Sequence, residues 1–335
     1  MYRLIFATLG VIAALSTANV KAQTVMKISS WAPPGHQQNS KVLPLMGKRI
    51  EAATEGRVKW KIEYKLASPL KQFEIVRDGI ADVAWIFHGY NTRYIASQAI
   101  EIPGHGATAE AASYAAQLAF ENHLHKANEH RGVVVATNFS HGDAVIHTKK
   151  PITALSDLKG MKVRVPGGVG SLVGKALGVV AVKLPAPKVY EALSSGVADG
   201  IFMPVEVQKS FRLKEVTPNV TFMPGGLYYG NFAILISPQF LDKLSAKDRK
   251  AVLSTTGRKF AKEVGKYWEY ADTVGFADAK KSGSKIQTAS PEMLSTFKKI
   301  TAKIEAGWLK RMGKYKNVDA KAALADLRAA IKNYK

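Results

Sequence analysis

Short apolar runs of strand type alternate with longer runs of helical periodicity along the first half of the chain. The segment 58–66 places Val58, Trp60 and Ile62 on one side, with charged residues between them, a pattern typical of a half-buried strand. Further strands are predicted at 26–31, 81–87 and 133–139, and helices at 40–55, 69–79 and 108–129. This β-α-β-α order favours parallel sheets covered by helices.

The second half continues the same alternation. Strands are predicted at 161–166, 181–184, 198–203 and 231–237, and helices at 169–177 and 186–195. A helical stretch then runs from about 238 to 281, and Ser245 with Asp248 three residues later predicts a cap and a break inside it. Ser290, followed by Pro291, predicts the start of another helix. No low-complexity linker separates the halves, so we predict an α/β chain of two lobes that crosses between them more than once.

The first 22 residues differ from the rest of the chain. Arg3 precedes a mostly apolar run at 4–15, and Val20-Lys21-Ala22 offers small side chains at the two positions that a signal peptidase reads. The apolar run is shorter than the roughly 20 residues that span a bilayer. We therefore expect a cleaved signal peptide over 1–22 and export to the periplasm, with a retained membrane anchor as the alternative. The chain has no Cys, which excludes disulfides and thiolate chemistry.

The net charge of +22 raises the possibility of nucleic-acid binding. However, the basic residues are scattered along the chain, and adjacent pairs such as Arg258-Lys259 and Lys310-Arg311 lie in amphipathic helical contexts. We predict no nucleic-acid partner. The charge is instead suited to long-range attraction of anionic ligands.

Signatures of catalysis and of cofactor binding are missing. The chain has no Gly-x-Ser-x-Gly elbow, no phosphate-binding Gly-x-x-x-x-Gly-Lys-Ser/Thr loop and no His-Glu-x-x-His motif. The glycine-rich segment 168–174 has one residue too many for a dinucleotide loop. His123, His125, Glu129 and His130 cluster in a predicted helix but point in two directions, which favours a surface helix over a metal site. We predict no cofactor, no metal and no enzyme activity.

Arg164 is the strongest candidate for ligand binding. It lies on the polar side of the strand predicted at 161–166, close to the carboxyl end, where Gly167-Gly168 leads into a helix. Open α/β sheets bind ligands in the crevice at that end of their strands. A guanidinium there can hold a carboxylate through two parallel hydrogen bonds, although an arginine on a strand can also be structural.

Four segments resemble the solute receptors of TRAP transporters (tripartite, ATP-independent periplasmic systems). They are SDLKGMKVRVP at 156–166, VYEALSSGVADG at 189–200, DGIADVA at 78–84 with Arg93-Tyr94, and the stretch 211–216. The resemblance covers nearly all of the chain after residue 22 in the same order. It implies a two-lobed periplasmic-binding-protein-like fold, with a ligand cleft between the lobes and a long helix spanning both. Lobe I would comprise 23–141 plus about 230–272, and lobe II 142–229 plus about 273–335.

The resemblance also implies roles for individual residues. In the family, the arginine at the position of Arg164 holds the ligand carboxylate, Asn231 resembles an asparagine of the cleft, and Arg93 resembles a second basic residue near it. Trp31, Tyr90 and Met203 stand where the more polar members, such as the sialic-acid type, carry polar or acidic side chains. Core packing is the alternative interpretation for Trp31 and Met203.

These observations lead to one hypothesis with two rivals. We predict a TRAP-type receptor for a monocarboxylate with an apolar or aromatic body, which delivers the ligand to TRAP membrane permease subunits. The walls of its pocket would be Trp31, Tyr90, Phe202, Met203 and Tyr228, with His141 at the border. The rivals are a receptor for a small hydroxy or keto acid, or for a dicarboxylate that uses Arg93 as a second clamp, and a periplasmic enzyme acting on organic acids.

Overall fold

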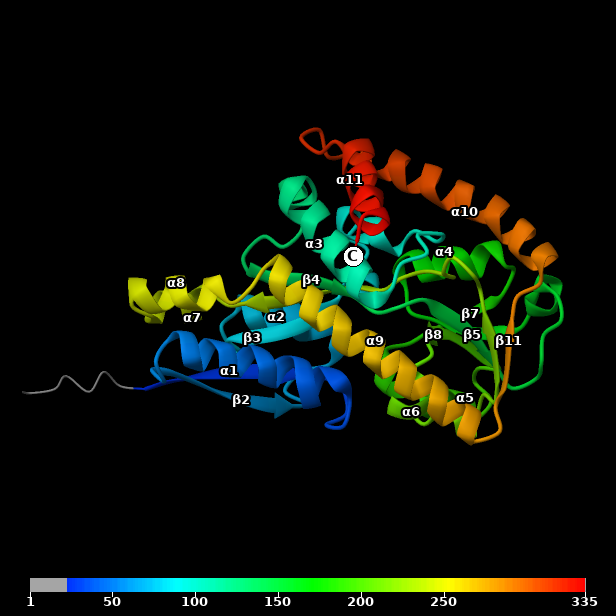
Figure 1. Ribbon diagram of the computed structural model, residues 1–335, viewed down its shortest axis with the longest axis horizontal. Coiled ribbons are helices and arrows are strands. Elements are labelled where there is room, and N and C mark those ends of the chain that lie inside the picture. Colours follow the sequence, from blue (N-terminus) through cyan, green and yellow to red (C-terminus); the bar gives the residue numbers. More distant parts are fainter. Residues whose placement is uncertain (1–22, 335) are drawn as a thin grey trace, which may run out of the picture.

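Two β-sheets with covering helices make up the part of the chain described by the computed structural model, residues 23–334 (Figure 1). The predicted signal peptide over 1–22 lies outside the described residues. The first sheet has the strand order β2-β1-β3-β10-β4. Its strands are β1 (Thr24–Ser30), β2 (Val58–Tyr64), β3 (Val83–Phe87), β4 (Val134–Ser140) and β10 (Asn231–Ile236).

The second sheet has the strand order β11-β9-β5-β8-β6-β7. Its strands are β5 (Ala144–Thr148), β6 (Lys162–Val165), β7 (Val180–Lys183), β8 (Gly200–Pro204), β9 (Asn219–Phe222) and β11 (Lys285–Thr288). The sequence pattern did not predict β5, β9 or β11. These strands are only four or five residues long.

The expectation of parallel sheets is wrong in part, because both sheets are mixed. β10 runs antiparallel to β3 and β4, and β5 runs antiparallel to β8 and β9. β5 and β10 are the strands by which the chain enters one sheet after leaving the other, following β4 and β9. The predicted α/β class with two lobes and repeated crossing is confirmed.

Helices cover the outer faces of the sheets. They are α1 (Leu43–Ala53), α2 (Gln72–Arg77), α3 (Ala109–Asn122), α4 (Gly168–Ala176), α5 (Val189–Ser194), α6 (Val207–Ser210), α7 (Pro238–Lys243), α8 (Ala246–Ser254), α9 (Arg258–Lys281), α10 (Pro291–Met312) and α11 (Ala320–Lys332). The predicted break at Ser245 is confirmed, because its hydroxyl accepts a hydrogen bond from the Asp248 N–H at the start of α8. A second break precedes α9 at Gly257, whose φ of 80° favours glycine. Ser290 caps α10 as predicted.

The helix predicted over 108–129 ends at Asn122 instead. Beyond it the chain turns, and the carboxylate of Glu129 accepts hydrogen bonds from the backbone N–H groups of Ile95, Ala96 and Ser97. This long-range cap stabilises a short helical segment at 96–101. A contact across more than 30 residues leaves no local signal in the sequence.

The C-terminal helix also departs from the predicted lobe boundaries, which placed residues 273–335 with lobe II. Leu324 and Leu327 of α11 pack in one buried cluster with Ala112 and Ala115 of α3. Helix α11 therefore lies with the helices of the first sheet, as Figure 1 shows. The lobe boundaries otherwise remain a prediction.

Helix α9 runs from the first sheet to the second (Figure 1). It approaches its neighbours closely at two glycines. A β-carbon at Gly265 would lie 2.6 Å from the carbonyl oxygen of Ala109 in α3, and one at Gly275 would lie 2.6 Å from that of Val205. The missing side chains therefore allow one helix to pack on elements of both sheets.

Gly265→Ala tests this close packing. Alanine favours a helix interior over glycine by about 1 kcal/mol, but overpacking of this kind costs about 1–3 kcal/mol. We expect a lower free energy of unfolding, measured by urea denaturation. The control is Gly307→Ala in α10, where the nearest atom to the new carbon is 3.6 Å away, so this variant should be as stable as the wild type or more so. Equal stabilisation by both substitutions would contradict the packing argument.

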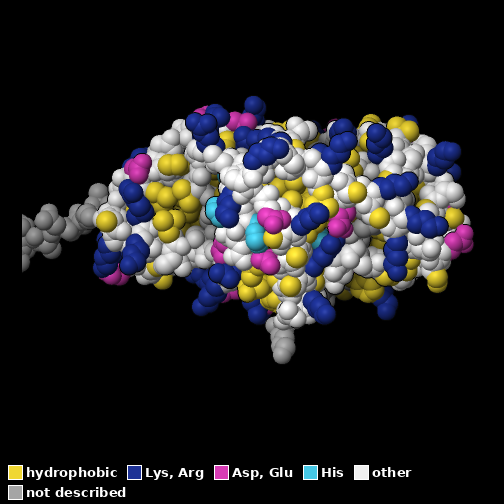
Figure 2. All heavy atoms as spheres, turned by 90° about the horizontal axis from the view of Figure 1, so that it is seen from above, with side chains coloured by type: hydrophobic (Ala, Val, Ile, Leu, Met, Phe, Trp, Pro, Cys, Tyr) yellow, Lys and Arg dark blue, Asp and Glu magenta, His cyan; other side chains and the backbone are white. Residues whose placement is uncertain are grey.

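The surface charge is dispersed. In Figure 2, Lys and Arg side chains are spread over the visible face between apolar and acidic groups and form no continuous stripe. Within residues 23–334, no helix has the length and apolar character that a membrane crossing requires.

Candidate functional site

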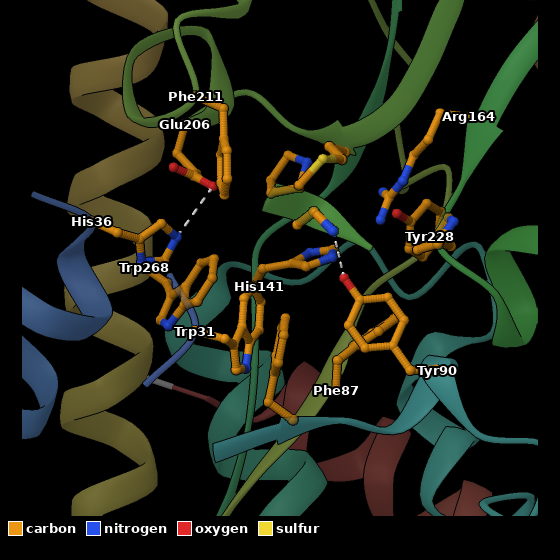
Figure 3. A pocket seen from close by; sticks show the side chains of 15 residues that line it. Trp31, His36, Phe87, Tyr90, His141, Arg164, Glu206, Phe211, Tyr228 and Trp268 are labelled. Atoms are coloured by element: carbon orange, nitrogen blue, oxygen red, sulfur yellow. Dashed lines mark hydrogen bonds and ion pairs between the residues drawn. The ribbon is translucent and has the colours of Figure 1, made fainter. Parts of the chain in front are cut away.

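A cavity between the two sheets contains the candidate site (Figure 3). Its walls are formed by Trp31, His36, Phe87, Tyr90, His141, Arg164, Pro166, Ala186, Met203, Pro204, Glu206, Phe211, Tyr228, Phe232 and Trp268. Both sheets, both passages between them and helix α9 contribute side chains.

Arg164 reaches the cavity from β6. Val163 and Val165 on the same strand point into the core of the second lobe, so the alternation of the strand turns Arg164 to the other face. The side chain is only 1% exposed. Its Nε donates a hydrogen bond to the carbonyl oxygen of Leu184 (3.0 Å), which fixes the plane of the guanidinium.

No carboxylate among residues 23–334 forms an ion pair with Arg164. The hydroxyl of Tyr90, which accepts a hydrogen bond from the Ala186 N–H (2.8 Å), lies beside it. An ionised group buried without a counter-charge costs several kcal/mol. An anion in the cavity would remove this cost, since a carboxylate can pair with the guanidinium through two hydrogen bonds.

Aromatic rings form most of the wall near the first sheet. Trp31 stacks on Trp85 with a ring separation of 3.9 Å, and its Nε1 donates to the carbonyl oxygen of Trp85 (3.1 Å). Phe232 stacks on Trp268 of α9 at 5.4 Å. These rings hold one another in fixed orientations, so the cavity presents flat apolar surfaces to a ligand.

The opposite end of the cavity contains a buried acid and a buried imidazole. Figure 3 shows Glu206, His36 and Phe211 on the side away from Arg164. Glu206 and His36 are each 2% exposed. Burial raises the pKa of Glu206 to about 7 and lowers the pKa of His36 to about 3.

A second buried acid supports this end of the site. Asp272 of α9 accepts a hydrogen bond from the backbone N–H of Glu206 (3.0 Å). Burial, and then the neighbouring Glu206 carboxylate, raise the pKa of Asp272 well above its usual value. The interaction ties α9 to the segment between β8 and α6.

Six of the nine residues that we predicted for the site line the cavity: Trp31, Tyr90, His141, Arg164, Met203 and Tyr228. His141 and Tyr228 lie on the two passages between the sheets. The Nδ1 of His141 is hydrogen-bonded to the carbonyl oxygen of Gly142 (2.6 Å), and the Tyr228 hydroxyl donates to the carbonyl oxygen of Phe202 (3.0 Å). Placement in the wall makes these residues candidates for ligand contact.

The other three predicted residues do not line the cavity. Phe202 follows Ile201 and precedes Met203 on β8, and because neighbouring side chains of a strand point to opposite faces, it packs in the core of the second lobe. Asn231 likewise turns away from the cavity that its neighbour Phe232 lines, and its amide donates to the carbonyl oxygen of Ser97. Arg93 lies over the ring of Phe73, 3.6 Å from its centre.

We did not predict Glu206 or Trp268 for the site from the sequence, and we gave no role to His36, Phe87, Phe211 or Phe232. A buried acid between valines, in Val205-Glu206-Val207, was an available signal for Glu206. Trp268 had none, because its place in the wall depends on the path of α9 across the molecule.

The His and Glu side chains that we predicted on a surface helix within 123–130 lie instead in different surroundings. His130 is 7% exposed, and its Nε2 lies 2.8 Å from that of His88. His123 pairs with Asp326 of α11 (2.8 Å). Among the described residues, no group of three or more His, Cys, Asp or Glu side chains could hold a metal ion.

Comparison with known proteins identifies the architecture. Bacterial extracellular solute-binding protein family 7 (DctP) matches residues 28–310. The chain belongs to this family. As a family 7 protein it is a TRAP solute-binding protein, and members of the family act outside the cytoplasm as receptors for small organic acids.

Solved family 7 proteins share the fold closely. A TRAP periplasmic solute-binding protein from Bordetella bronchiseptica, with (R)- and (S)-mandelate bound, is 33% identical, with a TM-score of 0.90 over 93% of this chain and all of that one. A marine metagenome TRAP protein specific for aromatic acid ligands, in complex with metahydroxyphenylacetate, is 30% identical, with a TM-score of 0.86 over 93% and 100% of the two chains. The outer membrane transporter protein TsaT of Comamonas testosteroni is 28% identical over 90% of each chain.

The raised pKa of Glu206 predicts a pH-dependent stability. The folded protein keeps this carboxyl protonated up to about pH 7, whereas the unfolded chain ionises it near 4.5. The wild type therefore loses stability between these values as the pH rises. Relative to wild type, Glu206→Gln should gain up to about 3 kcal/mol between pH 5 and pH 9, at about 1.4 kcal/mol per pKa unit. Urea denaturation at the two pH values measures this, and a difference independent of pH would contradict the shift.

Proposed function

We propose that this receptor captures a monocarboxylate with an aromatic body and delivers it to a TRAP membrane permease. The observation that carries the proposal is the buried guanidinium of Arg164, which faces the cavity and has no carboxylate partner among the described residues. Its charge and planar fork match one carboxylate group. In this proposal Arg164 holds the carboxylate, and Tyr90, the neighbour of its guanidinium, borders the same group.

The apolar walls support an aromatic body. Trp31, Phe87, Phe232 and Trp268 offer ring faces and edges, and Met203 adds a thioether. Apolar surface removed from water contributes about 25 cal/mol per Å², so a ring that buries about 100 Å² would gain about 2.5 kcal/mol. A sugar acid would bring hydroxyl groups that lose their hydrogen bonds to water against these walls.

The acidic group at the far end of the cavity disfavours a dicarboxylate ligand. Arg93, the second clamp in that alternative, packs on Phe73 outside the cavity. Glu206 occupies the end away from Arg164, and above about pH 7, where it is ionised, it would repel a second carboxylate of the ligand. A small hydroxy or keto acid would leave much of the aromatic wall without a partner.

The relatives support the same class of ligand. The Bordetella bronchiseptica protein holds mandelate and the marine protein is specific for aromatic acids, and both are at least 30% identical to this chain. We further propose that residues 1–22 direct export to the periplasm, and that the protein acts as a receptor and not as an enzyme. Membership of a family of extracellular solute-binding proteins supports both proposals.

Arg164→Ala tests the clamp. The substitution leaves a ligand carboxylate unpaired in a buried site, which typically costs about 2–5 kcal/mol of binding free energy, or roughly 30- to 5,000-fold in affinity. Arg164→Lys should also bind weakly because it lacks the planar fork. Isothermal titration calorimetry with mandelate and benzoate measures both. Arg93→Ala is the matched control and should bind nearly as tightly as wild type. Wild-type affinity in Arg164→Ala would disprove the clamp.

Competition between ligand classes tests the rest of the site. We expect an aromatic monocarboxylate to displace a small dicarboxylate or a sugar acid, and to raise the midpoint of thermal unfolding most at equal concentration, because binding to the folded state stabilises it. Benzoate, succinate and gluconate are suitable representatives. The aromatic specificity is wrong if gluconate or succinate binds most tightly.

A further inference from the structure

The end of the cavity opposite Arg164 has polar groups that the carboxylate clamp does not use. Glu206 and His36 both line the cavity and are both at least nine-tenths buried. The Nε2 of His36 lies 3.8 Å from the Oε1 of Glu206, too far for a hydrogen bond. The side chains of Ser210 and Gln37 also lie beside the Glu206 carboxyl, but no hydrogen bond joins Glu206 to His36. Buried polar groups are normally paired, so a polar pair left open at a cavity wall indicates a place for a ligand group.

The hydrogen-bonding roles of the two side chains follow from their surroundings. The Nδ1 of His36 accepts a hydrogen bond from the backbone N–H of Gln38 (3.1 Å). In the neutral ring the proton is then on Nε2, and burial keeps the ring neutral by lowering its pKa to about 3. Nε2 is therefore a donor, and above about pH 7, where Glu206 is ionised, its nearby carboxylate oxygen is an acceptor.

A donor and an acceptor at this spacing suit one chemical group. A hydroxyl donates one hydrogen bond and accepts another, and a single oxygen atom can lie about 2.8–3.0 Å from both Nε2 and Oε1. We propose that Glu206 and His36 form a subsite for a hydroxyl group on the aromatic ring of the ligand, with the hydroxyl donating to Glu206 and accepting from His36. This inference rests on the proposed function, because it assumes that Arg164 holds the carboxylate at the other end.

The subsite would select among aromatic acids as well as bind them. A ring without a donor leaves the buried Glu206 oxygen without a partner on the ligand, and a ring with a second carboxylate places two negative charges side by side. A hydroxyl satisfies both side chains. Phe211 and Trp268 lie against His36, with ring centres 5.8 and 5.3 Å away, and keep its imidazole in place.

A comparison of matched ligands on the wild-type chain tests the inference without relying on the folding of a variant. Benzoate and phenylacetate are titrated at pH 8 by calorimetry together with their 3- and 4-hydroxy and 3- and 4-fluoro derivatives. Fluorine is similar in size to a hydroxyl but donates no hydrogen bond. In at least one of the four pairs, the hydroxy acid should bind roughly ten- to a hundredfold more tightly than the fluoro acid, the gain expected for a hydrogen bond to a charged group.

Variants assign the effect to the two side chains. In Glu206→Leu the ratio of hydroxy to fluoro affinity should fall towards one, and in Glu206→Gln it should fall part of the way, because the amide oxygen still accepts but carries no charge. Glu191→Gln, an exposed glutamate of α5, is the matched control and should keep the wild-type ratio.

The outcomes separate this inference from the proposed function. Equal binding of hydroxy and fluoro acids in every pair, or a ratio that persists in Glu206→Leu, overturns the subsite and leaves the Arg164 clamp intact. Failure of all the aromatic acids to bind, or affinities unaffected by Arg164→Ala, overturns the proposed function and the subsite with it.

Discussion

The guanidinium of Arg164 is a charge held out of water with which no carboxylate of residues 23–334 forms an ion pair, and the cavity is built around this unbalanced charge. Its Nε–H bond to the Leu184 carbonyl and its contact with the Tyr90 hydroxyl orient the group, yet neither supplies a negative charge. A protein can tolerate such a group when a ligand provides the missing charge during its working cycle. The buried arginine thus costs stability in the empty receptor and supplies affinity in the loaded one.

The remainder of the fold keeps the walls in place around this charge. Each sheet has its own core, and the strands β6 and β8 aim Arg164 and Met203 at the cavity while their neighbours fill the core of the second lobe. Helix α9 runs along both lobes and places Trp268 in the cavity wall. Its Asp272 accepts a hydrogen bond from the backbone N–H of Glu206, which connects the helix to that segment. One helix therefore connects the aromatic wall with the acidic end of the site.

The polarity of the cavity is graded from one end to the other. A cation lies at one end, aromatic rings line the middle, and an acid with a neutral imidazole lies at the far end. This order matches an amphipathic organic acid better than a uniformly polar or doubly charged one. It also gives a physical reason why a receptor of this family could distinguish among ligands that share the same carboxylate.

Local patterns were enough to predict the class of fold, the break at Ser245, the cap at Ser290 and the position of Arg164, because each depends on periodicity or on motifs that lie close together in the chain. The resemblance added Trp31, Tyr90 and Met203, which the structure places in the wall. The mixed sheets became apparent in the three-dimensional structure alone, where β5 and β10 pair with strands far away in the chain. The tertiary structure also decided that Phe202, Asn231 and Arg93 turn away and that Glu206 faces His36. These outcomes depend on strand register and on contacts between residues far apart in the chain, which no local pattern of hydrophobic and polar positions specifies.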